Sequence, residues 1–209
     1  MAATLKSWRL FWILAFAITA ANGLALASAD PRTARGTEWL IVRAIECALP
    51  FLILTFTASS LAALWKTPAT RWLLANRRYV GLAFAYGMAW HFGYVIRYKL
   101  VFGLQPAPFD LALDFTGLVF LLAMTVTSFY PVRRRVSPVL WRRLHKTGIY
   151  TLWLLPTYFY LDDFYQDHTV FNFVMFAVLL AALTVRILSP ARTREAPLPG
   201  RLKAQTELT

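Results

Sequence analysis

The sequence is poor in charged residues and has a single cysteine. Of its 209 residues only 15% are Asp, Glu, Lys or Arg, whereas soluble domains carry about a quarter. The lone Cys47 excludes a disulfide framework and a CxxC site. No GxGxxG motif follows a strand, and there is no HExxH or serine–histidine pattern. A dinucleotide-binding domain and an intramembrane hydrolase are therefore not expected.

Apolar residues dominate what is present. The chain is 58% hydrophobic and 16% aromatic, with a mean hydropathy of +0.51, which is typical of an integral membrane protein. Six apolar stretches approach the ~20 residues that span hydrocarbon. They cover residues 8–28, 39–65, 79–98, 111–130, 144–161 and 170–188. The runs are too long for strands and lack alternation. We therefore predict an all-α fold: one transmembrane bundle of six helices over residues 1–188, followed by a polar cytoplasmic tail over 189–209.

The first stretch also resembles a signal peptide. Lys6 and Arg9 precede an apolar core, and ALASA at 25–29 offers a small-residue cleavage pattern. The apolar part is longer than the 7–15 residues typical of such signals. A retained first helix is the favoured interpretation, with cleavage left open.

Basic residues predict the orientation of the helices. Of the 22 Lys and Arg residues, 17 lie in the N-terminal segment, the second and fourth connections and the segment from Arg186. Only four lie on the opposite side, which also carries six acidic residues. By the positive-inside rule, both termini are cytoplasmic. The same distribution explains the net charge of +12, because these residues set the membrane topology and contact anionic lipid. Nucleic-acid binding is therefore not expected.

The densest basic patch is PVRRRVSPVLWRR, residues 131–143. Its favoured role is in setting topology. Docking of a soluble electron donor is the alternative.

His91 is an ionisable residue inside a predicted membrane helix. It lies 13 residues after Arg78, or roughly 20 Å along a helix, in the outer half of the membrane. Such residues usually mark function, as a metal or haem ligand or a proton relay. Small residues such as Gly87, one turn before His91, would let a macrocycle approach. Tight helix packing explains the same small residues equally well.

Arg43 and Glu46 lie three residues apart in the second predicted helix. This spacing allows an ion pair across one turn. A structural pair that faces the bundle interior is favoured, and contact with a cofactor propionate or a quinone is the alternative.

Several segments together resemble a known membrane family. RRYVGLAFAYGMAWHFGYV (77–95), LLAMTVTSF (121–129), WRRLHKTGIY (141–150) and GTEWLIVRAIE (36–46) resemble motifs of the ferric-reductase-like transmembrane family. Within that family they are most similar to the haem-binding membrane subunit of the periplasmic methionine-sulfoxide reductase system. The resemblance covers roughly residues 36 to 165, with order, spacing and helix placement in agreement.

The resemblance implies a bacterial inner-membrane protein that holds one or two b-type haems between its third and fifth helices. By position, His91 matches the helix-three iron ligand and His145 the first helix-five ligand. Electrons would come from quinol or a cytoplasmic flavin reductase and pass to a periplasmic, molybdenum-containing catalytic reductase. The similar subunit is also associated with FMN. A non-catalytic electron-transfer subunit is expected, and not a self-contained enzyme.

The sequence departs from that family at two ligand positions. Where the subfamily has a second helix-five histidine, 13 residues after the first, this chain has Tyr158. His168 lies beyond the predicted helix, and Pro156 is expected to kink or break the helix just before Tyr158. The broader family has a histidine 14 residues before His91, where this chain has Arg77, followed by Arg78.

Arg77 shares a helix face with His91 and is expected to pair with haem propionates. At the outer position, His91 would have Tyr158 as a second haem ligand or would be the only one. The outer haem site is therefore altered or lost, and one haem is a clear alternative to two. A haem-free scaffold or assembly protein on the same fold, and a small transporter whose path is lined by Arg43 and Glu46, are the competing hypotheses.

Overall fold

The computed structural model describes residues 8–103 and 107–189, where helices are joined by short turns and irregular segments. The prediction of an all-α fold is confirmed for these ranges, where no strand occurs. The helices are α1 (Trp8–Ser28), α2 (Ala34–Leu64), α3 (Pro68–Phe102), α4 (Pro108–Val126), α5 (Tyr130–Arg133), α6 (Pro138–Asp167) and α7 (Val170–Leu188). Five of the 17 basic residues that predict the orientation lie outside the described residues: Lys6, Arg192, Arg194, Arg201 and Lys203.

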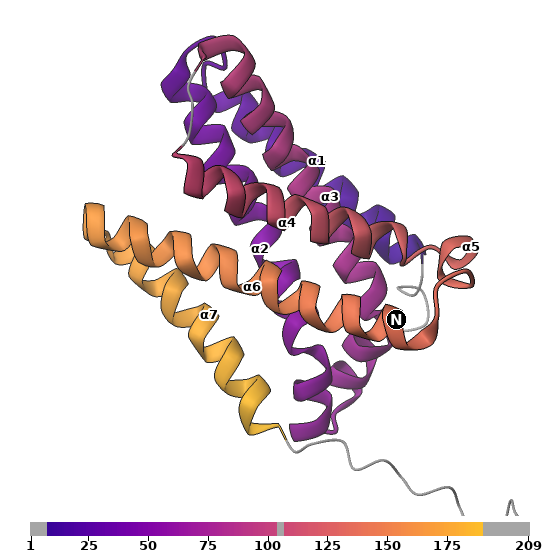
Figure 1. Cartoon of the computed structure of the whole chain (residues 1–209). Helices are drawn as coiled ribbons and strands as arrows, with labels where there is room; N and C mark the ends of the chain where they lie inside the picture. Colours follow the sequence, from indigo (N-terminus) through magenta and orange to yellow (C-terminus); the bar gives the residue numbers. More distant parts are fainter. Residues whose placement is uncertain (1–7, 104–106, 190–209) are drawn as a thin grey trace, which may run out of the picture.

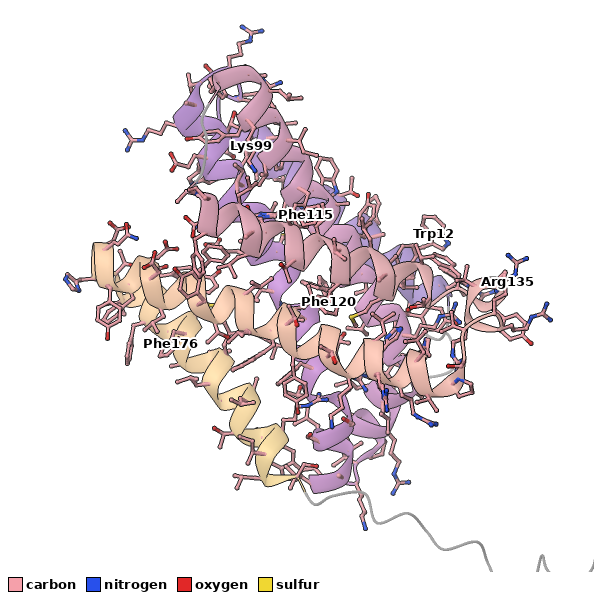
Figure 2. All side chains as sticks on the ribbon, in the orientation of Figure 1. Trp12, Lys99, Phe115, Phe120, Arg135 and Phe176 are labelled. Atoms are coloured by element: carbon pink, nitrogen blue, oxygen red, sulfur yellow. The ribbon has the colours of Figure 1, made fainter. Side chains whose placement is uncertain are left out.

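Within the described residues, four helices are long and apolar enough to cross a membrane by length and composition: α1, α2, α4 and α7. Large apolar side chains also cover the outside of the molecule. Trp12 and Phe115 are 66% and 65% exposed, and both are labelled in Figure 2. Such a surface suits lipid and not water. The chain therefore has the character of an α-helical membrane protein.

Polar caps extend two helices beyond the predicted apolar stretches. α3 begins at Pro68 and not at residue 79, because Thr67 Oγ1 accepts a hydrogen bond from the backbone N–H of Thr70 and Pro occupies the first helical position. α6 begins at Pro138 and not at 144 for the same reason, with Ser137 Oγ as the cap.

Two predicted helix ends are wrong. The helix predicted over 111–130 ends at Val126, and a short α5 follows after a turn. Pro156 does not break α6, which continues to Asp167. A proline removes only one backbone donor. Next to it, Thr157 Oγ1 donates to the Trp153 carbonyl at 2.8 Å.

A slot between α3 and α6 is lined by side chains of α2, α3, α4 and α6, and Figure 1 shows how these helices are arranged around it. α1, α2 and α3 pack against one another, and α4 packs on both α3 and α6. α7 packs on α6 and α2. α3 and α6 themselves have no close packing, so α2 and α4 form the other two sides of the slot.

Small residues set the distance between α2 and α3, which make the most extensive helix contact in the bundle. A Cβ added at Gly87 would lie 2.8 Å from Ala48 Cβ and 3.2 Å from Ala48 Cα. Ala48 and Ala83 are fully buried. This is close helix–helix packing through small residues. Gly87 therefore serves α2–α3 packing.

A second close approach joins α4 to α6. A Cβ added at Gly148 would lie 3.1 Å from Phe120 Cδ1, and a Cβ added at Gly117 would lie 2.6 Å from Leu155 Cδ1. Phe120 lies between the two helices in Figure 2. These contacts hold α4 against α6 and close one side of the slot.

Candidate functional site

Two adjoining cavities fill the slot. The inner cavity, of about 570 Å³, lies near the α5–α6 end of the slot and contains His145. The outer cavity, of about 310 Å³, contains His91. Phe84, Leu121 and Leu152 line both cavities and mark where they meet. Both volumes fall in or near the range of about 300–1,000 Å³ typical of ligand pockets.

Basic side chains line the inner cavity, and no acidic residue does so in the described ranges. They come from α3, α5, α6 and α7: Arg77, Arg78, Arg133, Arg142, Lys146 and Arg186. The only ion pair in the part of the chain that the structure describes is elsewhere, between Arg43 and Glu46. The inner cavity thus carries uncompensated positive charge.

Arg77 and Arg186 are half-buried members of this basic set with hydrogen-bond partners on neighbouring helices. Arg77 Nε donates to the Thr55 carbonyl at 2.9 Å. Arg186 Nη1 donates to the next carbonyl, that of Phe56, and Arg186 Nε donates to the Tyr150 hydroxyl at 2.9 Å. Two arginines from α3 and α7 are therefore fixed by neutral groups of α2 and α6. Their charges remain available to an anion, because neutral acceptors orient a guanidinium without neutralising it.

His145 is held at the edge of the inner cavity by two contacts. Its ring packs on Trp141, with centroids 4.2 Å apart, and its Nε2 lies 3.1 Å from Thr127 Oγ1. The Thr127 hydroxyl donates its one proton to the Ala123 carbonyl at 2.6 Å. It must therefore accept from His145 Nε2–H, which leaves Nδ1 as the nitrogen with a free lone pair.

His91 has the opposite tautomer. Its Nδ1 lies 3.1 Å from the Ile41 carbonyl, which can only accept, so Nδ1 carries the proton. In the neutral ring, Nε2 then presents a lone pair. His91 lines the outer cavity and His145 the inner one, so the structure does not bring the two predicted ligands into one cavity.

The outer cavity has the opposite charge to the inner one. Asp110 and Asp114 of α4 and Asp163 of α6 line it, and no Lys or Arg does so among the described residues. Tyr160 also lines it, and its hydroxyl, although buried, makes no hydrogen bond. The remaining walls are largely apolar.

Of three other residues considered from the sequence, Tyr158 and His168 line neither cavity, and Arg78 lines the inner one. Tyr158 lines neither cavity and packs on Phe109 with ring centroids 5.9 Å apart. His168 caps the end of α6 in a left-handed conformation, with φ of 50°, and is exposed. Arg78 lines the inner cavity, and its guanidinium lies 5.8 Å from the ring of Trp8.

Arg43 and Glu46 form the predicted pair, with Nη2 2.6 Å from Oε1. The pair lies on the α1 side of α2, beside a cavity of about 300 Å³ that Asn22 and Cys47 also line. Neither residue lines the slot. The pair is therefore placed away from any cofactor that the slot would hold.

Sequence reasoning missed Asp114, Tyr160, Thr127 and the interior position of Arg186. Asp114 is a single carboxylate inside an apolar helix, and that signal alone marks a functional candidate. Arg186 was assigned to the tail, although it lies within α7. Thr127 and Tyr160 had no distinguishing signal, because hydroxyl residues are common in membrane helices.

No group of three or more His, Cys, Asp or Glu side chains suited to a bare metal ion occurs in residues 8–103 and 107–189. Comparison of the chain with protein-family models, with curated proteins and with solved structures found no match.

Proposed function

We propose that the protein is a membrane electron carrier that holds one b-type haem in the inner cavity. The observation that carries this proposal is the pairing of His145 with an uncompensated basic lining in a cavity of about 570 Å³. In this proposal all six long helices cross a bacterial inner membrane, with both termini in the cytoplasm. The resemblance to the ferric-reductase-like family is part of its support.

The inner cavity fits haem by chemistry. Haem has an apolar macrocycle and two anionic propionates. Phe84, Leu121 and Ile149 offer apolar walls. Arg77 and Arg186 offer half-buried positive charge that no carboxylate of the described residues neutralises. Without an anion, like charges in a low-dielectric site repel one another, so an anionic ligand stabilises the cavity.

His145 would be the iron ligand. Its free Nδ1 is available to a metal, while Nε2–H donates to Thr127. Such an outer hydrogen bond orients a ligating imidazole and raises its basicity. Haem, when bound, supplies reversible one-electron chemistry. The chain's own residues hold the propionates, fix the ring of His145 and exclude water from the apolar walls.

The outer cavity does not fit a second haem. Asp110, Asp114 and Asp163 would repel propionates, and no basic residue in the described ranges lines the cavity to offset them. Tyr158, which occupies the position of the family's second helix-five histidine, does not line it. The proposal therefore contains one haem, with the outer site of the family altered.

The donor and acceptor are part of the same proposal. Quinol or a cytoplasmic flavin reductase would supply electrons at the inner side, and a periplasmic reductase, molybdenum-containing in the similar system, would receive them. FMN is a further cofactor of that similar system. The exposed basic residues around α5, of which Arg135 is labelled in Figure 2, offer a docking surface for an acidic soluble donor.

The test is a dithionite-reduced minus oxidised absorption spectrum of the detergent-purified full chain and three variants. We expect His145→Ala to lose the haem band, and His91→Ala to keep it. His168→Ala, at an exposed histidine, is the matched control and should also keep it. Loss of haem in His91→Ala, with haem retained in His145→Ala, would transfer the site to the outer cavity. Colourless wild-type protein, made with ample haem supply, would favour the scaffold or transporter hypotheses.

A further inference from the structure

Trp141, near the start of α6, contacts three groups around the inner cavity. Its ring lies against the His145 imidazole, with centroids 4.2 Å apart and an interplanar angle of 30°. Its Nε1–H donates to the Thr127 carbonyl at 3.2 Å. The Arg133 guanidinium of α5 lies over the same indole, 4.4 Å from the ring centroid. One side chain of α6 therefore joins α5, the end of α4 and the candidate iron ligand.

The bond from the indole N–H reaches the residue that selects the His145 tautomer. The Thr127 carbonyl lies at the C-terminal end of α4, where backbone carbonyls lose their intrahelical donors. Pro131, four residues later, has no N–H to offer it. The Trp141 N–H supplies a donor in its place. Because the Thr127 hydroxyl accepts from His145 Nε2–H, Trp141 fixes the backbone of the residue that holds this proton.

The aromatic face of Trp141 acts on the ring of His145 directly. A histidine ring can turn about its Cβ–Cγ bond, which exchanges the positions of its two nitrogens. An indole packed at 4.2 Å restricts that rotation. The indole is itself held by the cation–π contact with Arg133, which has no ion pair in the part of the chain that the structure describes.

We propose that Trp141 is a positioning residue for His145. Its ring keeps the imidazole turned so that Nε2–H donates to Thr127 and the Nδ1 lone pair stays available to a metal. The functional meaning of this role rests on the proposed haem, but the orientation of the ring is testable without haem. The alternative is a purely structural role, in which Trp141 anchors the end of α4 through its N–H alone.

Two substitutions separate the ring of Trp141 from its N–H. Trp141→Phe keeps an aromatic face beside His145 and loses the donor to the Thr127 carbonyl. Trp141→Leu loses both. Trp12→Leu is the matched control, because Trp12 is 66% exposed and lines neither cavity of the slot. A role as an anchor alone predicts the same behaviour for the Phe and Leu variants, whereas the positioning role predicts that only the Leu variant is impaired.

The first measurement uses the haem-containing full chain in detergent. We expect Trp141→Leu to transfer its haem to a scavenging protein about 10–100-fold faster than the wild type, as is typical for loss of an outer contact to a ligand. Its reduction potential should rise, because a loosened Nε2–H bond makes the imidazole a weaker donor. A merely loosened structure would admit water and lower the potential instead. Trp141→Phe and Trp12→Leu should stay close to the wild type in both measurements.

The second measurement does not depend on haem. The full chain is labelled with 15N-histidine, produced without haem supply, and its imidazole nitrogen shifts are recorded by NMR. The chain has three histidines, so the His145→Ala variant assigns the signals. We expect His145 to hold its proton on Nε2 in the wild type and in Trp141→Phe, and to show averaged nitrogen shifts in Trp141→Leu.

Four results would overturn the proposal. They are an Nδ1–H tautomer of His145 in the wild type, an unchanged tautomer in Trp141→Leu, equally fast haem transfer in the Phe and Leu variants, and a lowered potential in Trp141→Leu. The first of these decides the matter even where the Leu variant does not fold. A wild-type chain that binds no haem would contradict the proposed function, and the nitrogen shifts would still decide whether Trp141 positions His145.

Discussion

Replacing Gly87 by alanine tests the packing between α2 and α3. The added Cβ would lie 2.8 Å from Ala48 Cβ and 3.2 Å from Ala48 Cα. Neither atom belongs to a flexible side chain, so the helices must separate. Overpacking of this kind destabilises a protein by about 1–3 kcal/mol. Alanine also gains about 1 kcal/mol over glycine in helix propensity, which offsets part of that loss.

Gly93 provides the matched control on the same helix. A Cβ added there meets no atom within 4 Å. Gly93→Ala therefore gains the same helix propensity with no clash, and the difference between the two variants isolates the steric contribution. For a chain of this size, 1–3 kcal/mol corresponds to thermal midpoints that differ by roughly 2–12 °C. Tryptophan fluorescence during heating of the detergent-purified variants measures this difference.

Two outcomes would refute the reasoning. Equal midpoints for the Gly87 and Gly93 variants would show that Ala48 does not confine position 87. Loss of haem in Gly87→Ala, with its midpoint equal to that of Gly93→Ala, would instead restore the view that this glycine clears space for the macrocycle. We expect Gly87→Ala to be less stable and to bind haem while folded, because Gly87 lines neither cavity.

Three further predictions concern hydrogen bonds around the cavities. Thr127→Val should weaken haem retention about 10–100-fold by removing the acceptor for His145 Nε2–H, and Thr127→Ser should restore it; transfer of haem to a scavenging protein measures both. Arg186→Gln should lower the free energy of unfolding by about 1–3 kcal/mol, because its hydrogen bonds are lost. It should also lower the reduction potential of the haem, because a positive charge beside the haem is lost. Arg186→Lys keeps the charge but not the guanidinium hydrogen bonds, so it should restore the potential more than the stability. Tyr160→Phe should raise the thermal midpoint, because it removes a buried hydroxyl with no partner, whereas Tyr150→Phe, which loses the Arg186 contact, should lower it; the opposite order would contradict the hydrogen-bond assignment.

Hydropathy predicts where the helices lie better than where they end. The first predicted stretch, 8–28, has the bounds of α1, and 170–188 those of α7. Both are flanked by polar residues, so the apolar run and the helix coincide. α3 and α6 continue well past their apolar cores, because Thr67 and Ser137 cap them and polar residues continue the helix. Both caps precede a proline, a pattern that is readable from the sequence.

α3 and α6 are also the two long helices that fall short of the composition expected of a membrane span. Both face the slot, and both carry the polar residues that line it. A helix that contributes to a polar interior is less apolar than one that faces lipid. The features that weaken the transmembrane signal are therefore the ones that indicate the site.

The candidate site was predictable only in part. His91, His145 and Arg77 stand out as ionisable groups among apolar residues, and each lines a cavity. The division of the slot into a basic and an acidic cavity was not predictable. It depends on which side chains of α4 and α7 face α3 and α6, and a single sequence does not encode those helix rotations in any local pattern.

The most direct measurement is the number of haem groups per chain in the purified wild-type protein, from a pyridine haemochrome assay combined with amino-acid analysis. The account predicts one haem b per chain, because, of the two cavities in the slot, the inner one combines a histidine with positive charge among the described residues. A value near zero, with ample haem supplied during expression, would contradict the electron-carrier proposal. A value near two would contradict the exclusion of haem from the outer cavity.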